Sequence, residues 1–149
     1  MIKLKSILAI MCTAFLLASC TNEITRLTGE YSYKVSGTAL VDTAKEALPN
    51  EIGSLQIIDR GEDGLLLTFN TLEGALYTAD GSLKDGELLL AAFQRTLRLT
   101  ASSYKVTVNG SGTVYDGTIV FNLTYAGTLL EGNKSLTATD VLLIAKKNK

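Results

Sequence analysis

Alternation of apolar and polar residues is the clearest pattern along this chain. In the first such segment, Tyr31, Tyr33, Val35, Ala39 and Val41 occupy odd positions, and most residues between them are polar. A period of two places one set of side chains on a buried face and the other in solvent. The segment therefore predicts a half-buried β-strand.

Further apolar runs follow, separated by turn-forming residues. Asp85-Gly86 and Asp116-Gly117 each lie between two such runs. Asp-Gly favours tight β-hairpins because both residues tolerate a positive φ. The predicted strands after the first are, in chain order, 54–58, 65–70, 76–83, 87–92 (continued or restarted at 96–100), 104–114, 119–125 and 140–146.

Two details modify this pattern. Residues 44–48 predict a short helical turn, which Pro49 ends because the residue before proline is disfavoured in the α region. Gly110 and Gly112 fall on the apolar parity of their strand, which indicates a bulge or a sharp bend where side chains would crowd.

About eight strands with almost no helix predict an all-β fold. The strands form an antiparallel meander that closes into a small barrel or, alternatively, folds into a β-sandwich. Glycine-punctuated hairpins such as 108–119 are similar to those of small calycin-like, that is lipocalin-like, bacterial lipoproteins, and the similarity covers residues 29–146. This resemblance implies a barrel that binds a small apolar or amphipathic ligand. A barrel whose interior is filled by its own side chains would instead be an interaction, accessory or inhibitor module.

The N-terminal segment has its own pattern. Lys3 and Lys5 precede an uncharged run that ends in Leu17-Ala18-Ser19-Cys20. A basic start, a short apolar stretch and small residues before the cleavage site are typical of a secretory signal. With cysteine directly after them, the stretch resembles a bacterial lipobox, which implies cleavage before Cys20 and acylation of its thiol.

The resulting organisation is a signal peptide at 1–19, a lipidated Cys20 with a short tether at 20–28, and a β-barrel domain at 29–149. The acyl chains would anchor the protein to a membrane of the cell envelope. By the same resemblance, the absence of an aspartate after Cys20 favours the outer membrane. It leaves undecided whether the protein is on the periplasmic or the external face of that membrane.

Composition excludes several classes of function. The sequence has two cysteines and no histidine. Cys12 would leave with the signal and the sulfur of Cys20 would become a thioether, so the mature domain would have no thiol for catalysis or metal binding. We therefore expect a non-enzymatic protein without cofactor or metal. Removing Lys3 and Lys5 leaves 12 basic against 15 acidic residues, which argues against a nucleic-acid binder.

The aromatic residues on the apolar parity are the candidate ligand pocket: Tyr31, Tyr33, Tyr104, Phe121 and Tyr125. The alternative is that these tyrosines are core residues whose hydroxyls are satisfied at the barrel rim.

Arg95, Arg98 and Lys105 form a second candidate, a basic spot for an anionic ligand. A solvated strand face is the interpretation that the pattern favours, because charged residues are rarely buried without a partner.

Overall fold

The structure is a computed structural model that describes residues 23–100 and 102–149. A helical turn at 23–27 precedes the first strand. The strands, all paired antiparallel, are β1 (Gly29–Ser36), β2 (Thr38–Val41), β3 (Ala44–Ala47), β4 (Ile52–Gly61), β5 (Gly64–Thr71), β6 (Leu76–Lys84), β7 (Glu87–Leu99), β8 (Ser102–Tyr115), β9 (Thr118–Leu129) and β10 (Ser135–Lys147).

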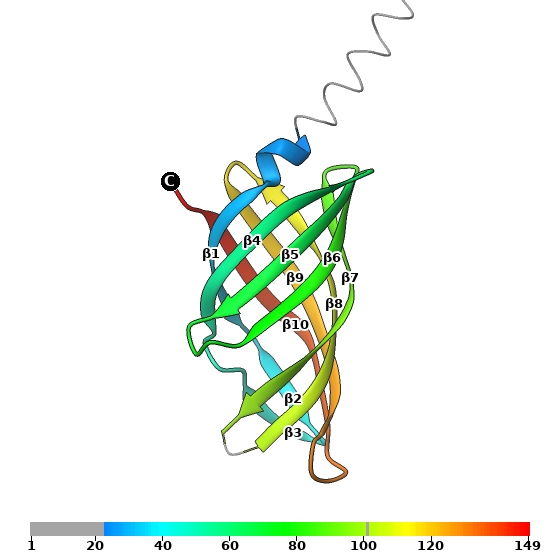
Figure 1. Ribbon diagram of the computed structural model, residues 1–149. Helices are drawn as coiled ribbons and strands as arrows, with labels where there is room; N and C mark the ends of the chain where they lie inside the picture. The colour runs from blue at the N-terminus through cyan, green and yellow to red at the C-terminus, as the bar shows by residue number, and fades with distance from the viewer. Residues whose placement is uncertain (1–22, 101) are drawn as a thin grey trace, which may run out of the picture.

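Eight of these strands close into a barrel (Figure 1). β1 pairs with β4, the strands from β4 to β10 pair in chain order, and β10 returns to pair with β1. The closing ladder runs from Tyr31↔Lys147 to Ser36↔Leu142. The predicted all-β meander and the barrel are thus confirmed, and the sandwich alternative is wrong.

The two extra strands, β2 and β3, form a hairpin inserted between β1 and β4. β2 pairs with the start of β10, and β3 pairs with β2 over Thr38↔Ala47 to Val41↔Ala44. The helical turn predicted at 44–48 is therefore wrong. Asp42 has a φ of 53°, which suits the tight turn between these strands. An isolated helix of one turn is unstable, so pairing with a neighbouring strand prevails.

Besides the register shift between Asp59 and Gly61 at the β4–β5 turn, two bulges reshape the barrel wall. The register of β7 against β8 shifts between Leu90 and Phe93, and the register of β10 against β9 shifts between Ala138 and Val141. Each shift places one extra residue in β7 or β10, which bends the strand and increases its twist.

The glycines on the apolar parity of β8 lie at this bend. Gly110 is opposite Leu90, at the edge of the bulge, so the extra residue belongs to β7 and not to β8. A Cβ at Gly110 would lie 2.3 Å from the backbone oxygen of Asn122, and one at Gly112 would lie 2.7 Å from the ring of Phe121. The prediction of crowding is confirmed by these distances.

The interior of the barrel is packed with apolar side chains. Most residues on the inward parity are almost fully buried, and partly buried apolar residues pack against them: Tyr77, Leu83, Phe93, Val114 and Leu129. The residues with the largest fully buried side chains are Tyr31, Leu55, Ile57, Leu65, Leu67, Phe69, Leu88, Val106, Ile119, Phe121, Leu136 and Leu143.

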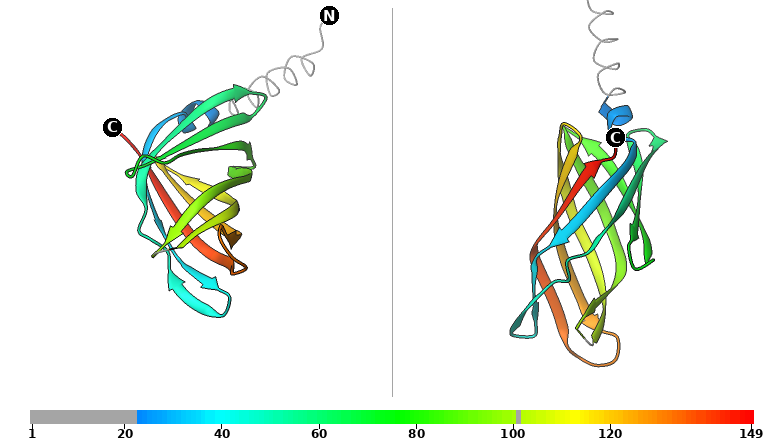
Figure 2. Two further views of the ribbon diagram at one scale, coloured as in Figure 1. Left: turned by 60° about the horizontal axis from the view of Figure 1, so that its bottom comes forward. Right: turned by 90° about the vertical axis from the view of Figure 1, so that its left-hand side faces the viewer.

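The two ends of the barrel differ (Figure 2). One end carries the helical turn, the β4–β5, β6–β7 and β8–β9 turns, and the end of β10. The opposite end carries the β5–β6, β7–β8 and β9–β10 connections and the β2–β3 hairpin. Within the described ranges, no helix is both long enough and apolar enough to cross a membrane.

Candidate functional site

A buried ion pair lies inside the barrel, toward the end opposite the helical turn. Glu51 immediately precedes β4, and Arg95 lies on the inward parity of β7 between Phe93 and Leu97. Nη2 of Arg95 is 2.5 Å from Oε2 of Glu51, and Nη1 is 3.0 Å from Oε1. Only 7% of the Arg95 side chain and 13% of the Glu51 side chain are exposed. The pair is thus a two-pronged contact in a largely dry environment.

Tyrosine hydroxyls complete the partners of the carboxylate. Tyr77 on β6 and Tyr33 on β1 donate to Oε1 of Glu51 at 2.7 and 3.0 Å. Nη1 of Arg95 also donates to the Tyr77 hydroxyl at 2.8 Å. These bonds join β1, β6 and β7 across the barrel, so the burial of two charges is offset by a shared network.

The same cluster fills the part of the barrel wall where β6 and β7 lie next to each other without backbone pairing, which we name the β6–β7 seam. β6 and β7 pair only from Gly81↔Leu90 to Lys84↔Glu87. Beyond this ladder the two strands meet through side chains, because the Tyr77 ring stacks on Phe93 at 5.7 Å and the Arg95 guanidinium lies 4.3 Å above Tyr77. Phe69 on β5 extends the stack at 5.1 Å from Tyr77. Aromatic and cation–π contacts thus hold the seam where backbone pairing stops.

Protonation in the cluster follows from its burial and its charges. Burial alone raises the pKa of Glu51, but the hydrogen bonds and charge of Arg95, with the two tyrosine bonds, lower the pKa below its ordinary value of 4.5. Burial raises the pKa of Tyr125 to about 12. Burial also raises the pKa of Tyr33 and Tyr77, so all three phenols stay neutral at physiological pH.

One donor of the cluster is unused. In the part of the chain that the structure describes, Nε of Arg95 is the only buried side-chain nitrogen or oxygen without a hydrogen-bond partner. Burial raises the pKa of Tyr125 on β9, and the charge of the nearby Arg95 guanidinium and a side-chain hydrogen-bonding contact with it lower that pKa, although Nε itself has no partner in hydrogen-bond geometry. An unpaired guanidinium N–H in a buried place is costly, so it is a candidate contact for an acceptor atom of a ligand.

A cleft of about 600 Å³ reaches this cluster from outside. We name it the Arg95 cleft. Its volume lies in the range of small-molecule sites. Glu51 and Arg95 belong to its lining, and Leu72 and Ile52 line it with 74% and 46% of their surface exposed. The remaining lining residues are Pro49, Asn50, Thr71, Glu73, Ala75, Thr96, Leu97, Arg98, Thr100 and Ser103.

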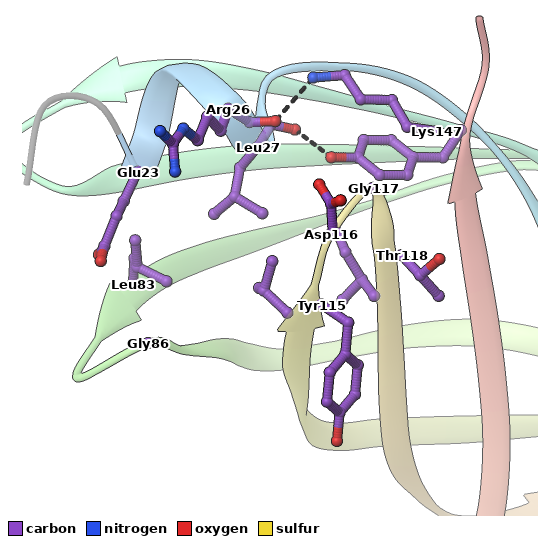
Figure 3. Close-up of a pocket in the computed structure, with 13 residues that line it drawn as sticks. Glu23, Arg26, Leu27, Leu83, Gly86, Tyr115, Asp116, Gly117, Thr118 and Lys147 are labelled. Atoms are coloured by element: carbon purple, nitrogen blue, oxygen red, sulfur yellow. Dashed lines mark hydrogen bonds between the residues drawn. The ribbon is translucent and has the colours of Figure 1, made fainter.

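A second cleft, of about 680 Å³, lies at the helical-turn end of the barrel (Figure 3). We name it the helical-turn cleft. Residues of the helical turn form one side and the turn between β8 and β9 forms another, as Figure 3 shows. Its lining residues are Glu23, Arg26, Leu27, Tyr31, Leu83, Gly86, Val114, Tyr115, Asp116, Gly117, Thr118, Ile119 and Lys147.

The residues predicted as a pocket are all buried, but they do not meet at one place. Tyr33 and Tyr125 lie at the Arg95 cluster. Tyr31 lies at the helical-turn end, where its hydroxyl donates to the Leu27 carbonyl at 2.8 Å. Tyr104 on β8 is paired with Leu97 and Leu129, and Phe121 packs beside Gly112 in the barrel wall; the former is 3% and the latter 0% exposed.

Cys20 and the predicted signal peptide at 1–19 lie outside the described residues. Residues 23–28 are part of the folded unit: Ile24 and Leu27 of the helical turn are 7% and 3% exposed, and Thr28 N donates to the Ile24 carbonyl. The folded unit therefore begins before Gly29.

The ion pair was not anticipated from the sequence. The prediction of a solvated strand face is wrong for Arg95 and fits Arg98 and Lys105, which are exposed. A signal was present, since Arg95 shares the parity of Phe93 and Leu97. No local pattern marks Glu51, because it lies in a connection, and its partner comes from a distant strand.

The comparisons add no assignment to this geometry: no protein-family model matches the chain, and no curated protein matches it either. Among the described residues, no group of three or more aspartate, glutamate, cysteine or histidine side chains could hold a metal ion.

Proposed function

We propose that this protein is a lipid-anchored protein of the cell envelope whose barrel binds a small amphipathic molecule at the Arg95 cleft. The observation that carries the proposal is the buried Glu51–Arg95 cluster, with one unpaired donor at Nε of Arg95, in the lining of a cleft that opens to solvent. Nε is closed to solvent, so a ligand oxygen would satisfy this donor by moving neighbouring side chains aside, and the bond would be stronger than in water because the surroundings are dry.

The charge of the cluster selects the polar group of the ligand. Arg95 and Glu51 together are neutral, and both oxygens of Glu51 already accept hydrogen bonds. An anionic head would be repelled by the Glu51 carboxylate nearby, whereas a neutral carbonyl, ester or hydroxyl oxygen would accept from Nε without that cost. The ligand class is therefore an amphiphile with a neutral polar head.

The mouth of the cleft suits the apolar part of such a molecule. Leu72 and Ile52 line it with much of their surface exposed, and Leu76, beside it on β6, is 67% exposed. Covering apolar surface of this kind favours binding by about 25 cal/mol per Å² before the costs of association are subtracted.

The anchor part of the proposal rests on the lipobox-like Leu17-Ala18-Ser19-Cys20. Two or more acyl chains bind a membrane stably, whereas one binds marginally. A Cys20→Ala variant expressed in a bacterial host should lose its partition into the detergent phase and its acyl mass in intact mass spectrometry. Partition and mass that match the parent would exclude acylation at Cys20.

A second candidate function is a non-enzymatic interaction or inhibitor module. Its support is the packed interior, in which Tyr31, Val35, Val106, Phe121 and Leu123 are each at most 3% exposed. In that case the clefts at the two ends would be incidental and the loops would contact an envelope protein.

Calorimetric titration with 1-decanoylglycerol, and with decanoate as the charged counterpart, separates these candidates. We expect the neutral ligand to bind more tightly than the anion. Leu72→Asp, an exposed substitution that leaves the core intact, should weaken its binding about tenfold, equivalent to about 1.4 kcal/mol. Leu130→Asp, at a 55% exposed residue outside the cleft, is the matched control. Absence of binding by both ligands, or equal loss in both variants, would contradict the ligand site and favour the interaction module.

A further inference from the structure

The helical turn fixes the start of the folded unit against one end of the barrel. Its side chains Ile24 and Leu27 are buried, and two side chains of the barrel donate hydrogen bonds to its carbonyl groups. Tyr31 donates to the carbonyl of Leu27 at 2.8 Å, and Nζ of Lys147 donates to the carbonyl of Arg26 at 2.7 Å. The position at which the chain enters the barrel is thus set by packing and hydrogen bonds together.

This fixed entry limits how far the barrel can stand from an anchor at Cys20. Only Thr21 and Asn22 lie between Cys20 and Glu23. Three residue steps span at most about 10 Å even when fully extended. The headgroup layer of a bilayer is roughly 5–7 Å thick on each side. A barrel anchored at Cys20 must therefore bring its helical-turn end to the headgroups, whatever the conformation of the spacer.

The helical-turn cleft has the chemistry of such a contact. Leu27, Leu83 and Val114 give it an apolar lining. At its margin, Glu23 and Arg26 lie on the helical turn and Asp116 lies at the β8–β9 turn, as Figure 3 shows. With Lys147, the charged lining residues are two acidic and two basic, so the cleft has no net charge.

We propose that the helical-turn end is the membrane-contacting face of the barrel and that its cleft binds the headgroup of a zwitterionic phospholipid. The Arg26 guanidinium would pair with the phosphate, and Glu23 or Asp116 with the ammonium group. Tyr115, which lines the same cleft and is 59% exposed, ends β8 at the end that would face the membrane, where amphipathic rings are favoured in the interfacial layer. This inference rests on the proposed acylation of Cys20, and it leaves the Arg95 cleft at the end facing away from the membrane.

The orientation can be measured with single spin labels. The described residues contain no cysteine, so Tyr115→Cys and Leu130→Cys each introduce one labelling site in the acylated protein. These positions are similarly exposed, at 59% and 55%, and lie at opposite ends of the barrel. In nanodiscs of phosphatidylethanolamine and phosphatidylcholine, we expect the label at 115 to be several-fold less accessible to an aqueous relaxation reagent than the label at 130. Equal accessibility in protein of confirmed acyl mass overturns the orientation, whereas a protein without acyl mass overturns the anchor itself.

The headgroup assignment has a separate readout. Native mass spectrometry of the acylated protein released from these nanodiscs should show one retained phospholipid. Arg26→Gln should lower the retained fraction several-fold, while Arg60→Gln, at an exposed arginine outside the cleft, should leave it unchanged. Equal retention by both variants would overturn the zwitterionic headgroup site. So would retention of phosphatidylglycerol in preference to phosphatidylethanolamine when the nanodiscs also contain phosphatidylglycerol.

Discussion

The two ends of the barrel are stabilised by different physics. At the helical-turn end, the buried side chains of Ile24 and Leu27 form an apolar plug. The neutral hydroxyl of Tyr31 and the exposed ammonium of Lys147 donate to the carbonyls of the helical turn. At the opposite end, a buried guanidinium and carboxylate replace the plug, and the hydroxyls of Tyr33 and Tyr77 complete their bonding. Burying apolar surface is favourable by itself, whereas burying charge is favourable only while the network is complete.

This difference between the two ends bears on where a ligand could stabilise the fold by binding. At the helical-turn end the carbonyls of Arg26 and Leu27 accept hydrogen bonds from Lys147 and Tyr31, so these polar groups are satisfied where the plug covers the barrel. The ion pair leaves Nε of Arg95 without a partner, and it lies where β6 and β7 are no longer hydrogen-bonded to each other. A stable fold can tolerate one buried donor without a partner, and a ligand that supplies an acceptor for this donor would gain binding free energy.

Breaking the ion pair should have the largest effect on stability. Arg95→Met leaves the Glu51 carboxylate buried without its cation, and we expect a loss of about 3–5 kcal/mol in the free energy of unfolding. Urea denaturation followed by circular dichroism would measure it.

Two further variants show whether the uncompensated charge is the cause. Glu51→Gln combined with Arg95→Met should lose less than Arg95→Met alone, since no charge is left unpaired. Arg60→Met removes the exposed pair with Asp80, whose side chains are 55% and 68% exposed, and should cost at most about 1 kcal/mol. A double variant as unstable as the single one would indicate that packing of the arginine stem, and not charge, dominates.

Removing part of the plug should have the next largest effect. Leu27→Ala creates a cavity at the end of the barrel, and we expect a loss of about 2 kcal/mol, at the low end for such changes because a terminal turn can relax. Ile58→Ala, at a position 42% exposed on the outside of β4, should change stability by less than about 0.5 kcal/mol in the same urea titration. Equal effects would mean that the helical turn does not contribute to the core.

The strands of the barrel wall were more predictable from the sequence than either end of the barrel. Alternation of Tyr31, Tyr33 and Val35 and the Asp-Gly turns predicted the strands and hairpins, because strand parity and turn chemistry are local properties. Chain closure through β1 and β10 agreed with a barrel, although the register of that ladder has no local signal.

The remaining features depend on long-range contacts. Glu51 and Arg95 are 44 positions apart, and the partner of a charged residue on an inward parity cannot be read from its neighbours. The hairpin at 38–47 replaced a predicted helical turn because β10 offers an edge to β2. Conversely, the tether predicted at 20–28 includes residues 23–27, which form a helical turn whose Ile24 and Leu27 are buried against the barrel end. In each case the tertiary partner determines the local structure.

Acidification should weaken the polar end selectively. The pKa of Glu51 is lower in the folded protein than its ordinary value of 4.5, so its contribution to stability is complete above that value and is lost as pH falls through the folded pKa. The loss should be smaller than that of Arg95→Met, because a protonated Glu51 can still accept from the tyrosines. Urea titrations between pH 7 and pH 3 should show a steeper decline in the parent than in the double variant Glu51→Gln/Arg95→Met. Parallel declines would assign the acid sensitivity to other carboxylates.

The smallest expected effect tests whether hydrogen bonding or apolar burial holds the plug. Tyr31→Phe keeps the ring, which is 2% exposed, and removes only the bond from its hydroxyl to the Leu27 carbonyl. We expect a loss of about 1 kcal/mol, as for one buried hydrogen bond, and so less than for Leu27→Ala. Tyr115→Phe, at an exposed phenol, should leave stability unchanged in the same measurement. If Tyr31→Phe instead cost more than Leu27→Ala, the carbonyl bond would be the main restraint, and the two ends would both depend on polar contacts.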